Sequence, residues 1–277
     1  MSAPRDVALL TQHGKERLLA PALEPVLGRR VRRVSGFDTD RLGTFTREIR
    51  RQGTQMEAAR RKARTGMELA GAGLGLASEG AFGADPYTGL LAWNTEIVMF
   101  IDDGTGLEIT GEAHGPARRS HGLVADWTGL CALAEAAGFP EHGLTLRPEH
   151  EDHPAVTKGI ADWGRLRETF HALCERSAGG GVFAESDLRA HCNPTRQGVI
   201  RRAAENLAAR LRSRCPACDA PGFWVTTHLP GLGCRWCGEP THAPRAEHWA
   251  CPACGHATER AVTDTAADPA HCVQCNP

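Results

Sequence analysis

From residue 7 to about residue 212, apolar residues fall into short runs separated by polar and glycine-containing segments. Runs of this length bounded by glycine are typical of buried strands, and they lie at Val7–Gln12, Arg29–Ser35, Leu74–Gly83, Leu144–Arg147 and Val182–Glu185. Helices are predicted over Lys15–Leu27, Thr54–Gly71, Gly122–Ala137, Ile160–Cys174 and Pro194–Arg212. The clearest hairpin joins Trp93–Ile101 to Leu107–Ala113. An antiparallel hairpin beside strand–helix alternation predicts an α/β domain with a mixed sheet.

Two glutamates in this pattern are candidate functional residues. Glu79 lies in the apolar run LGLASEGAFG and is followed by Gly80. A carboxylate at the end of a buried strand lies where α/β enzymes keep their chemistry, although a Glu that only forms a salt bridge is the alternative. Glu57 also has a structural alternative, because Thr54 with Glu57 three residues later fits a capping box at a helix start.

The chain is nearly neutral as a whole, but one stretch is strongly basic. The formal net charge is −1, which gives no global attraction to nucleic acid or to an anionic membrane. Residues 29–64, however, carry twelve basic residues against the four acids Asp38, Asp40, Glu48 and Glu57. The basic residues are Arg29, Arg30, Arg32, Arg33, Arg41, Arg47, Arg50, Arg51, Arg60, Arg61, Lys62 and Arg64. Such a stretch suits a polyanionic ligand such as a nucleotide phosphate chain, or is a solvated helix face.

The N-terminal segment MSAPRDVALL does not have the pattern of a signal peptide, and no run of about eighteen apolar residues is present. We therefore expect a cytoplasmic protein without membrane contact. Cysteines in a reducing compartment are poor disulfide candidates and good metal ligands.

The composition changes at the first of four CxxC motifs, which predicts an α/β domain over residues 1–212 and a small zinc-stabilised domain over 213–277. The motif cysteines are Cys215, Cys218, Cys234, Cys237, Cys251, Cys254, Cys272 and Cys275. Each motif presents two thiolates from a tight turn, and two motifs complete a closed tetrahedral site. We therefore expect two structural Zn²⁺ ions, because four thiolates leave no open position for catalysis.

The pairing of the four motifs is not determined by their spacing. Sequential pairing gives a double zinc ribbon, with the first two motifs on one ion and the last two on the other. Interleaved pairing is the alternative. We favour sequential pairing because both pairs have similar loop lengths. Of the remaining cysteines, Cys131 and Cys174 lie in apolar helical segments and are expected to pack as small hydrophobes.

The order of features from residue 7 to about 210 resembles the inosine/xanthosine triphosphatases, within the superfamily of house-cleaning nucleoside triphosphate pyrophosphatases. Thr11-Gln12-His13-Gly14-Lys15 is similar to their phosphate-binding turn at Thr and Lys, with Gln12 in place of Asn. GTQMEAARRKAR is similar to their Glu/Arg-rich helix, and ASEGAFG to their strand with a catalytic acid. Gly180-Gly181 is similar to a glycine pair that precedes a late strand in this family, and Thr195-Arg196 is similar to the Thr-Arg pair that enters its last helix.

The resemblance implies a three-layer α/β domain that hydrolyses nucleoside triphosphates. Glu57 and Glu79 would hold Mg²⁺ or Mn²⁺ and activate water, with Lys15 also in the catalytic set. The phosphate-binding residues would be Thr11, Gln12, His13, Lys15, Arg61 and Arg196. The nucleobase, the choice between pyrophosphate and phosphate release, and homodimer formation stay open.

A non-catalytic adaptor is the alternative function. In it the zinc ribbons contact nucleic acid or protein, and the first domain only senses a nucleotide. The tail carries Trp224, Trp236 and Trp249, which could stack on bases or fill a small core. Its basic residues are few, so the tail alone is not expected to bind nucleic acid strongly.

Overall fold

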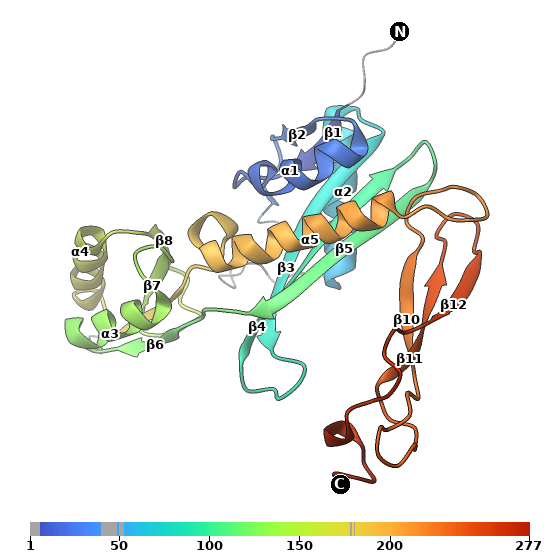
Figure 1. The fold of residues 1–277 in the computed structure, drawn as a ribbon. Helices are drawn as coiled ribbons and strands as arrows, with labels where there is room; N and C mark the ends of the chain where they lie inside the picture. The colour runs from blue at the N-terminus through green and yellow to red at the C-terminus, as the bar shows by residue number, and fades with distance from the viewer. Residues whose placement is uncertain (1–5, 40–48, 50–52, 178, 180) are drawn as a thin grey trace. The chain divides into compact units, whose positions relative to one another are not determined.

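The computed structural model describes residues 6–39, 49, 53–177, 179 and 181–277. The chain divides into two compact units. Figure 1 shows the course of the chain, coloured by residue number. The first unit comprises residues 1–104 and 110–208, and the second comprises 105–109 and 209–277. The second unit therefore begins inside the last long helix and also takes in a short segment near the start of β5.

The first unit is built on a five-stranded sheet with the order β2-β1-β3-β4-β5. Its strands are β1 (Val7–Leu10), β2 (Val31–Val34), β3 (Leu74–Ala84), β4 (Ala92–Asp102) and β5 (Leu107–Pro116). β1 is parallel to both β2 and β3, whereas β3 and β4 are antiparallel over their full lengths. The predicted mixed sheet is confirmed.

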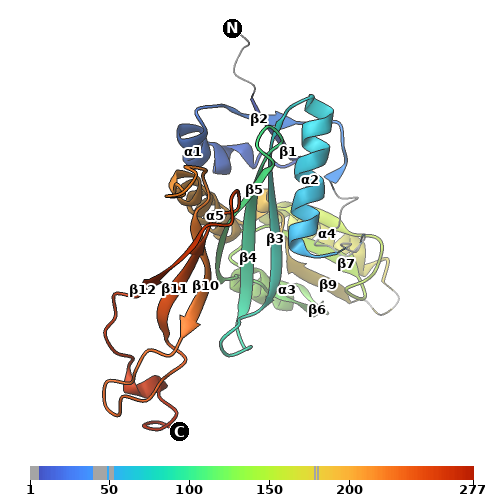
Figure 2. The same ribbon diagram turned by 90° about the vertical axis from the view of Figure 1, so that its right-hand side faces the viewer.

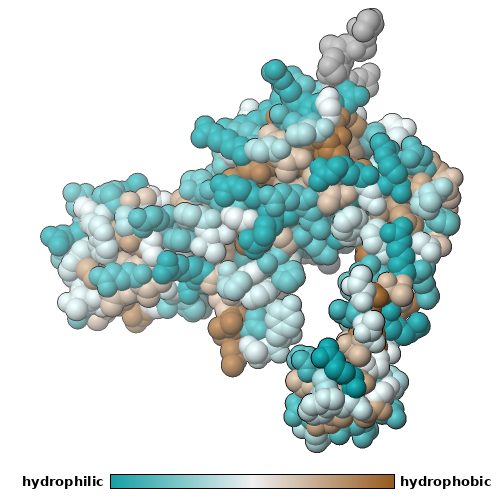
Figure 3. All heavy atoms as spheres, in the orientation of Figure 1, coloured by the Kyte–Doolittle hydropathy of each residue, from teal (hydrophilic) through white to brown (hydrophobic). Residues whose placement is uncertain are grey.

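Helices cover both faces of this sheet. Figure 2 shows α2 (Gln55–Ala70) on one face and α1 (Glu16–Leu27) and α5 (Pro194–Arg212) on the other. Small residues let α2 lie close to the strands, since a side chain at Gly75 would overlap Met67. The core on the α2 face consists of Ala59, Ala63, Met67, Ala77, Ile97, Met99 and Ile101. The surface along α5 is mostly hydrophilic (Figure 3).

A second, antiparallel sheet in the first unit has the order β6-β9-β7-β8. Its strands are β6 (His121–Val124), β7 (Leu144–Pro148), β8 (Thr157–Ile160) and β9 (Val182–Ser186). It packs against α3 (Trp127–Ala137) and α4 (Trp163–Cys174). Leu130, Leu144, Leu166 and Phe170 are among the residues of this second core.

Two helix starts in this region were predicted too early. Residues 121–124 pair with β9 as a strand instead of opening α3, and Ile160 ends β8 instead of opening α4. The helices begin after Asp126 and Asp162, whose carboxylates accept hydrogen bonds from the amides of Gly129 and Arg165. These N-cap aspartates are the sequence signal that marks the true starts.

The second unit contains a three-stranded antiparallel sheet and a very small core. The strands are β10 (Trp224–Pro230), β11 (Pro244–Ala250) and β12 (Ala257–Ala261), paired in that order. Cys215, Phe223 and Cys251 are buried together, with Trp249 packed against them. The guanidinium of Arg260 lies 4.2 Å from the centre of the Trp249 ring. No helix among the described residues of either unit is long and apolar enough to cross a membrane.

Candidate functional site

The eight motif cysteines form two groups of four. Within each group, the sulfur atoms lie within 4.8 Å of one another. The first group is Cys215, Cys218, Cys251 and Cys254, and the second is Cys234, Cys237, Cys272 and Cys275. The structure thus forms two tetra-cysteine sites that could each hold a zinc ion.

Sulfur–sulfur distances in both groups fit a tetrahedral metal site. Cys215 and Cys254 are 3.8 Å apart and Cys218 and Cys251 are 3.7 Å apart. The second group has corresponding distances of 3.8 and 3.6 Å. A tetrahedron with metal–sulfur bonds of about 2.3 Å has an edge of about 3.8 Å, whereas a disulfide bond is about 2.05 Å long. The sulfur spacing therefore fits four ligands around one ion and does not fit disulfide bonds.

The pairing of the motifs is interleaved, so the preference for sequential pairing was wrong. β10 leads from the first motif to the second, and β11 runs antiparallel back to the third. β12 then leads back toward the fourth motif. Strands of about seven residues span roughly 23 Å, which separates consecutive motifs and brings alternate ones together. Loop length alone does not contain this information.

Each motif also has a turn that presents its sulfurs. The amides of Ala217 and Ala253 donate to the sulfurs of Cys215 and Cys251 at 3.4 Å. The residue after the second cysteine has positive φ in three motifs, at Asp219, Gly238 and Gly255. Glycine adopts this conformation without strain, which explains two of the three positions.

In the first unit, the turn Thr11–Lys15 lies where the order of the parallel strands reverses. The chain leaves β1 through α1 to β2 on one side and returns through α2 to β3 on the other. In open α/β sheets, ligands bind outside the carboxyl ends of the strands at such a reversal. Leu9 pairs with Leu76, so the start of the turn lies level with Ser78 and Glu79.

Lys15 points into this edge of the sheet and is only 9% exposed. Its ammonium donates to the carbonyl oxygen of Ser78 at 3.0 Å and to the Ser78 hydroxyl at 3.2 Å. Burial, together with nearby Arg196 and Lys62, lowers the pKa of Lys15 to about 7, although Glu96 and Glu79 act in the opposite direction. Lys15, Lys62 and Arg196 thus lie in one cluster with the carboxylates of Glu79 and Glu96.

Glu96 and Arg196 form a buried ion pair beside Lys15. Arg196 Nε lies 2.6 Å from Glu96 Oε1, and Arg196 Nη1 donates to the carbonyl of Leu188 at 2.7 Å. Asn94 also donates to the Glu96 carboxylate. Gly80 is the cross-strand partner of Glu96, and a Cβ atom there would overlap both the carboxylate and the guanidinium. The glycine after Glu79 makes room for this pair.

The two glutamates predicted to hold a metal have different surroundings. Glu79 Oε1 lies 2.7 Å from Lys62 Nζ, so the salt bridge considered as its alternative is present. Glu57 accepts hydrogen bonds from the amide and hydroxyl of Thr54, so the predicted capping box is confirmed. These bonds lower the pKa of Glu57, with smaller effects from Arg61 and Arg60.

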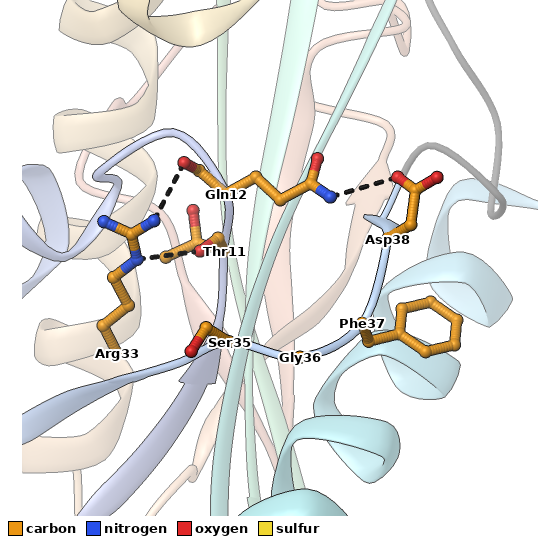
Figure 4. Close-up of a pocket in the computed structure, with 7 residues that line it drawn as sticks. All are labelled: Thr11, Gln12, Arg33, Ser35, Gly36, Phe37 and Asp38. Carbon is orange, nitrogen blue, oxygen red and sulfur yellow. Dashed lines mark hydrogen bonds between the residues drawn. The ribbon is translucent and has the colours of Figure 1, made fainter.

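Two hollows flank the turn. The first, of about 360 Å³, is lined by Thr11, Gln12, Arg33, Ser35, Gly36, Phe37 and Asp38 (Figure 4). Arg33 donates to the carbonyls of Thr11 and Gln12 at 3.2 and 3.1 Å, and the Gln12 amide donates to Asp38 at 3.0 Å. The charged groups of this hollow thus fix the shape of the turn.

The second hollow, of about 340 Å³, is lined by His13, Gly14, Arg17, Leu18, Ala190, His191, Gln197 and Arg201. The rings of His13 and His191 are stacked, with centroids 4.3 Å apart. Burial, followed by the charges of His191 and Arg189, lowers the pKa of His13 to about 4. Burial likewise raises the pKa of Cys192, beside His191, to about 12, so this thiol is not a nucleophile at neutral pH.

The structure brings together Lys15, Glu79 and Arg196 from the predicted set. Glu57 lies at the exposed start of α2, where it caps the helix, and Arg61 is exposed one turn further along α2. Sequence reasoning missed Glu96, although a single acid within the apolar run of β4 is a visible signal. It also did not select Arg17 or Arg201, which no local pattern marks. Arg41, Arg47, Arg50, Arg51 and Gly180 lie outside the described residues.

The fold and the cysteine sites define an α/β protein with a C-terminal unit that could bind two metal ions. A family model described as a domain of unknown function (DUF6671) matches residues 62–277, and the chain belongs to this family. The match includes Glu79, Glu96, Arg196 and all eight motif cysteines, and it begins after the turn that carries Lys15. No curated protein matches the chain, and no solved structure does.

Proposed function

We propose that the first unit binds nucleoside triphosphates at the turn Thr11–Lys15 and hydrolyses them. The observation that carries this proposal is the buried ammonium of Lys15 at the strand reversal. A buried lysine whose pKa is lowered toward 7 is costly for the fold and is characteristic of functional sites. A bound phosphate chain would place negative charge beside Lys15, whose ammonium is hydrogen-bonded to the neutral carbonyl and hydroxyl of Ser78.

The proposed class is the one that the residue order resembles, the inosine/xanthosine triphosphatases. A mixed sheet with helices on both faces supports the choice, as does the position of Glu79 in β3 close to Lys15. Thr11, Gln12 and His13 would contact phosphates from the turn. Arg196, held by Glu96, would act mainly through its field, whereas Arg61 is exposed on α2 and could contact the ligand directly.

Mg²⁺ or Mn²⁺ belongs to this proposal as an ion that arrives with the nucleotide. Mg²⁺ is usually held by one or two protein carboxylates together with substrate phosphates. Glu79 fits this role better than Glu57, since Glu79 lies among the cations at the sheet edge and Glu57 is bonded to Thr54. When bound, the ion would neutralise charge on the phosphates. Lys15 and Lys62 would orient the phosphate chain from the protein side.

Hydrolysis of a panel of nucleoside triphosphates with Mg²⁺ tests the proposal. We expect release of pyrophosphate or phosphate from at least one purine triphosphate, with mass-spectrometric detection to tell the two products apart. Lys15→Met and Glu79→Gln should each lower the rate by at least about a hundredfold. Lys158→Met and Glu135→Gln, which change charge at β8 and at an exposed position of α3, serve as matched controls. A wild-type protein inactive on the whole panel would refute the hydrolase proposal.

The second candidate is an adaptor that contacts a protein through the second cysteine group. Trp236 and Val273 lie inside the two motifs of that group and are 77% and 64% exposed. Residues 231–277 contain Arg235, Arg245 and Arg260 against five acids, Glu239, Glu247, Glu259, Asp264 and Asp268. This balance disfavours the nucleic-acid form of the adaptor and leaves a protein partner as the better alternative.

A further inference from the structure

The second hollow beside the turn has the composition of an anion site. Its lining contains two arginines, two histidines and a glutamine, and no acidic residue. It draws on three elements, with Arg17 from α1, His191 from the 3₁₀ turn Ala190–Cys192, and Arg201 from α5. Its volume of about 340 Å³ is at the lower end of the range for small-ligand pockets.

The two arginines are not committed to other groups. In the part of the chain that the structure describes, neither Arg17 nor Arg201 has an ion pair or side-chain hydrogen bond. Arg33 in the first hollow differs, because it is bonded to two carbonyls of the turn. Guanidinium groups recognise phosphate oxygens through paired hydrogen bonds, so two uncommitted arginines that line one hollow are suited to bind a phosphate group.

We propose that the hollow lined by His13, Arg17, His191, Gln197 and Arg201 binds a phosphate group. The inference does not depend on hydrolysis and would stand if the first unit had no catalytic activity. The phosphate belongs either to a free inorganic anion or to the phosphate chain of a nucleotide whose remainder extends past Gly14 toward Lys15. Both sources offer the same oxygen atoms to the two guanidinium groups.

The stacked histidines can also contact a phosphate bound in this hollow. With the pKa of His13 near 4 and that of His191 also lowered, both rings are neutral at pH 7. A neutral ring can donate one N–H to a phosphate oxygen. The cationic groups Arg189, Lys15 and Lys62 disfavour protonation of His13. A phosphate dianion in the hollow would offset them and raise the pKa of His13.

Calorimetric titration of the zinc-loaded full chain with inorganic pyrophosphate tests the site at low ionic strength. Arg17→Gln and Arg201→Gln should each weaken binding by about tenfold or more, the effect of losing one charge-assisted hydrogen bond. Arg165→Gln removes the same charge from an exposed position on α4 and should leave the affinity within about twofold. Equal affinity in all four proteins, or an equal loss in Arg165→Gln, would overturn the proposal.

Two further measurements locate the phosphate and identify its source. In histidine NMR titrations, pyrophosphate should raise the pKa of His13 in the wild type and not in Arg201→Gln; an unchanged His13 would also overturn the proposal. Lys15→Met tells whether the site binds a free inorganic anion or the phosphate chain of a nucleotide. A free-anion site keeps its pyrophosphate affinity in this variant, whereas a nucleotide site loses inosine triphosphate binding in both Lys15→Met and Arg201→Gln. A wild-type protein that binds pyrophosphate but hydrolyses no nucleoside triphosphate would refute the proposed function alone.

Discussion

In the second unit, both candidate metal sites are made of cysteines alone, and the two cysteines of each CxxC motif are three residues apart in sequence. In the first unit, Lys15, Glu79, Glu96 and Arg196 come from a turn, two strands and a helix. Each of these residues also has a bonded partner in the fold. The cysteine sites can therefore be recognised from spacing, whereas the charge cluster exists only once the sheet has formed.

The largest expected effect concerns the candidate metal sites. Cys251→Ser should lower zinc content from two ions to one, because structural zinc contributes on the order of 10 kcal/mol to small domains. Interleaved pairing predicts that Cys215, Cys218 and Cys254 become reactive to alkylation, while the second group stays protected. Native mass spectrometry and mapping of the alkylated cysteines provide the measurement.

Matched variants make this result specific. Cys272→Ser should expose Cys234, Cys237 and Cys275 and leave the first group intact. Cys131→Ser lies outside both groups and should retain two ions. If Cys251→Ser exposed Cys272 and Cys275 instead, the pairing would be sequential and the strand argument would fail.

An intermediate effect is expected from the buried ion pair of the first unit. Glu96→Gln leaves the guanidinium of Arg196 buried without its carboxylate, and should lower the free energy of unfolding by about 3–5 kcal/mol. Asp103→Asn breaks the exposed pair with Arg64 and should cost less than about 1 kcal/mol. Chemical denaturation of both variants checks the difference; similar losses would show that the Glu96 pair is not structurally special.

The same contrast explains what the sequence could predict. The predicted capping box at Thr54 is local, and the structure has it. The glycine that ends α2 and the Asn193 cap of α5 are signals of the same local kind. The mixed sheet also followed from strand–helix alternation. The interleaved cysteine pairing did not, because it depends on the direction of β11 relative to β10.

The candidate site shows the same limit at the level of single residues. Lys15 could be selected from its place just after a strand, and Glu79 as the single acid in an apolar run. The prediction that Glu79 ends its strand was wrong, because β3 continues to Ala84 and Glu79 lies in its middle. The partners of these two residues, Ser78 and Lys62, are set by the register of β1 on β3 and by the packing of α2. Glu96 reaches the cluster only because Gly80 has no side chain. Such relations are tertiary, so no window of sequence contains them.

The last prediction concerns the pH dependence of stability that Lys15 imposes. The pKa of Lys15 falls from 10.5 to about 7 on folding, so between these values the unfolded chain binds a proton that the folded protein has released. Stability should therefore rise with pH across this window, by at most about 1.4 kcal/mol per pH unit. The destabilisation by buried charge is fully present below pH 7 and is lost toward pH 10.5.

Lys15→Met removes this titration while it also removes two hydrogen bonds to Ser78. The loss of the buried charge stabilises this variant and the loss of the hydrogen bonds destabilises it, so its absolute stability is not diagnostic. The change of its stability with pH depends on the titration alone. Denaturation at pH 7, 8 and 9 should show a positive slope in the wild type that exceeds the slope of Lys15→Met. Lys158→Met, at β8, should keep the wild-type slope. Parallel plots of stability against pH for wild type and Lys15→Met would mean that Lys15 keeps its ordinary pKa. The buried lysine would then no longer support an anion-binding site at this place in the sheet.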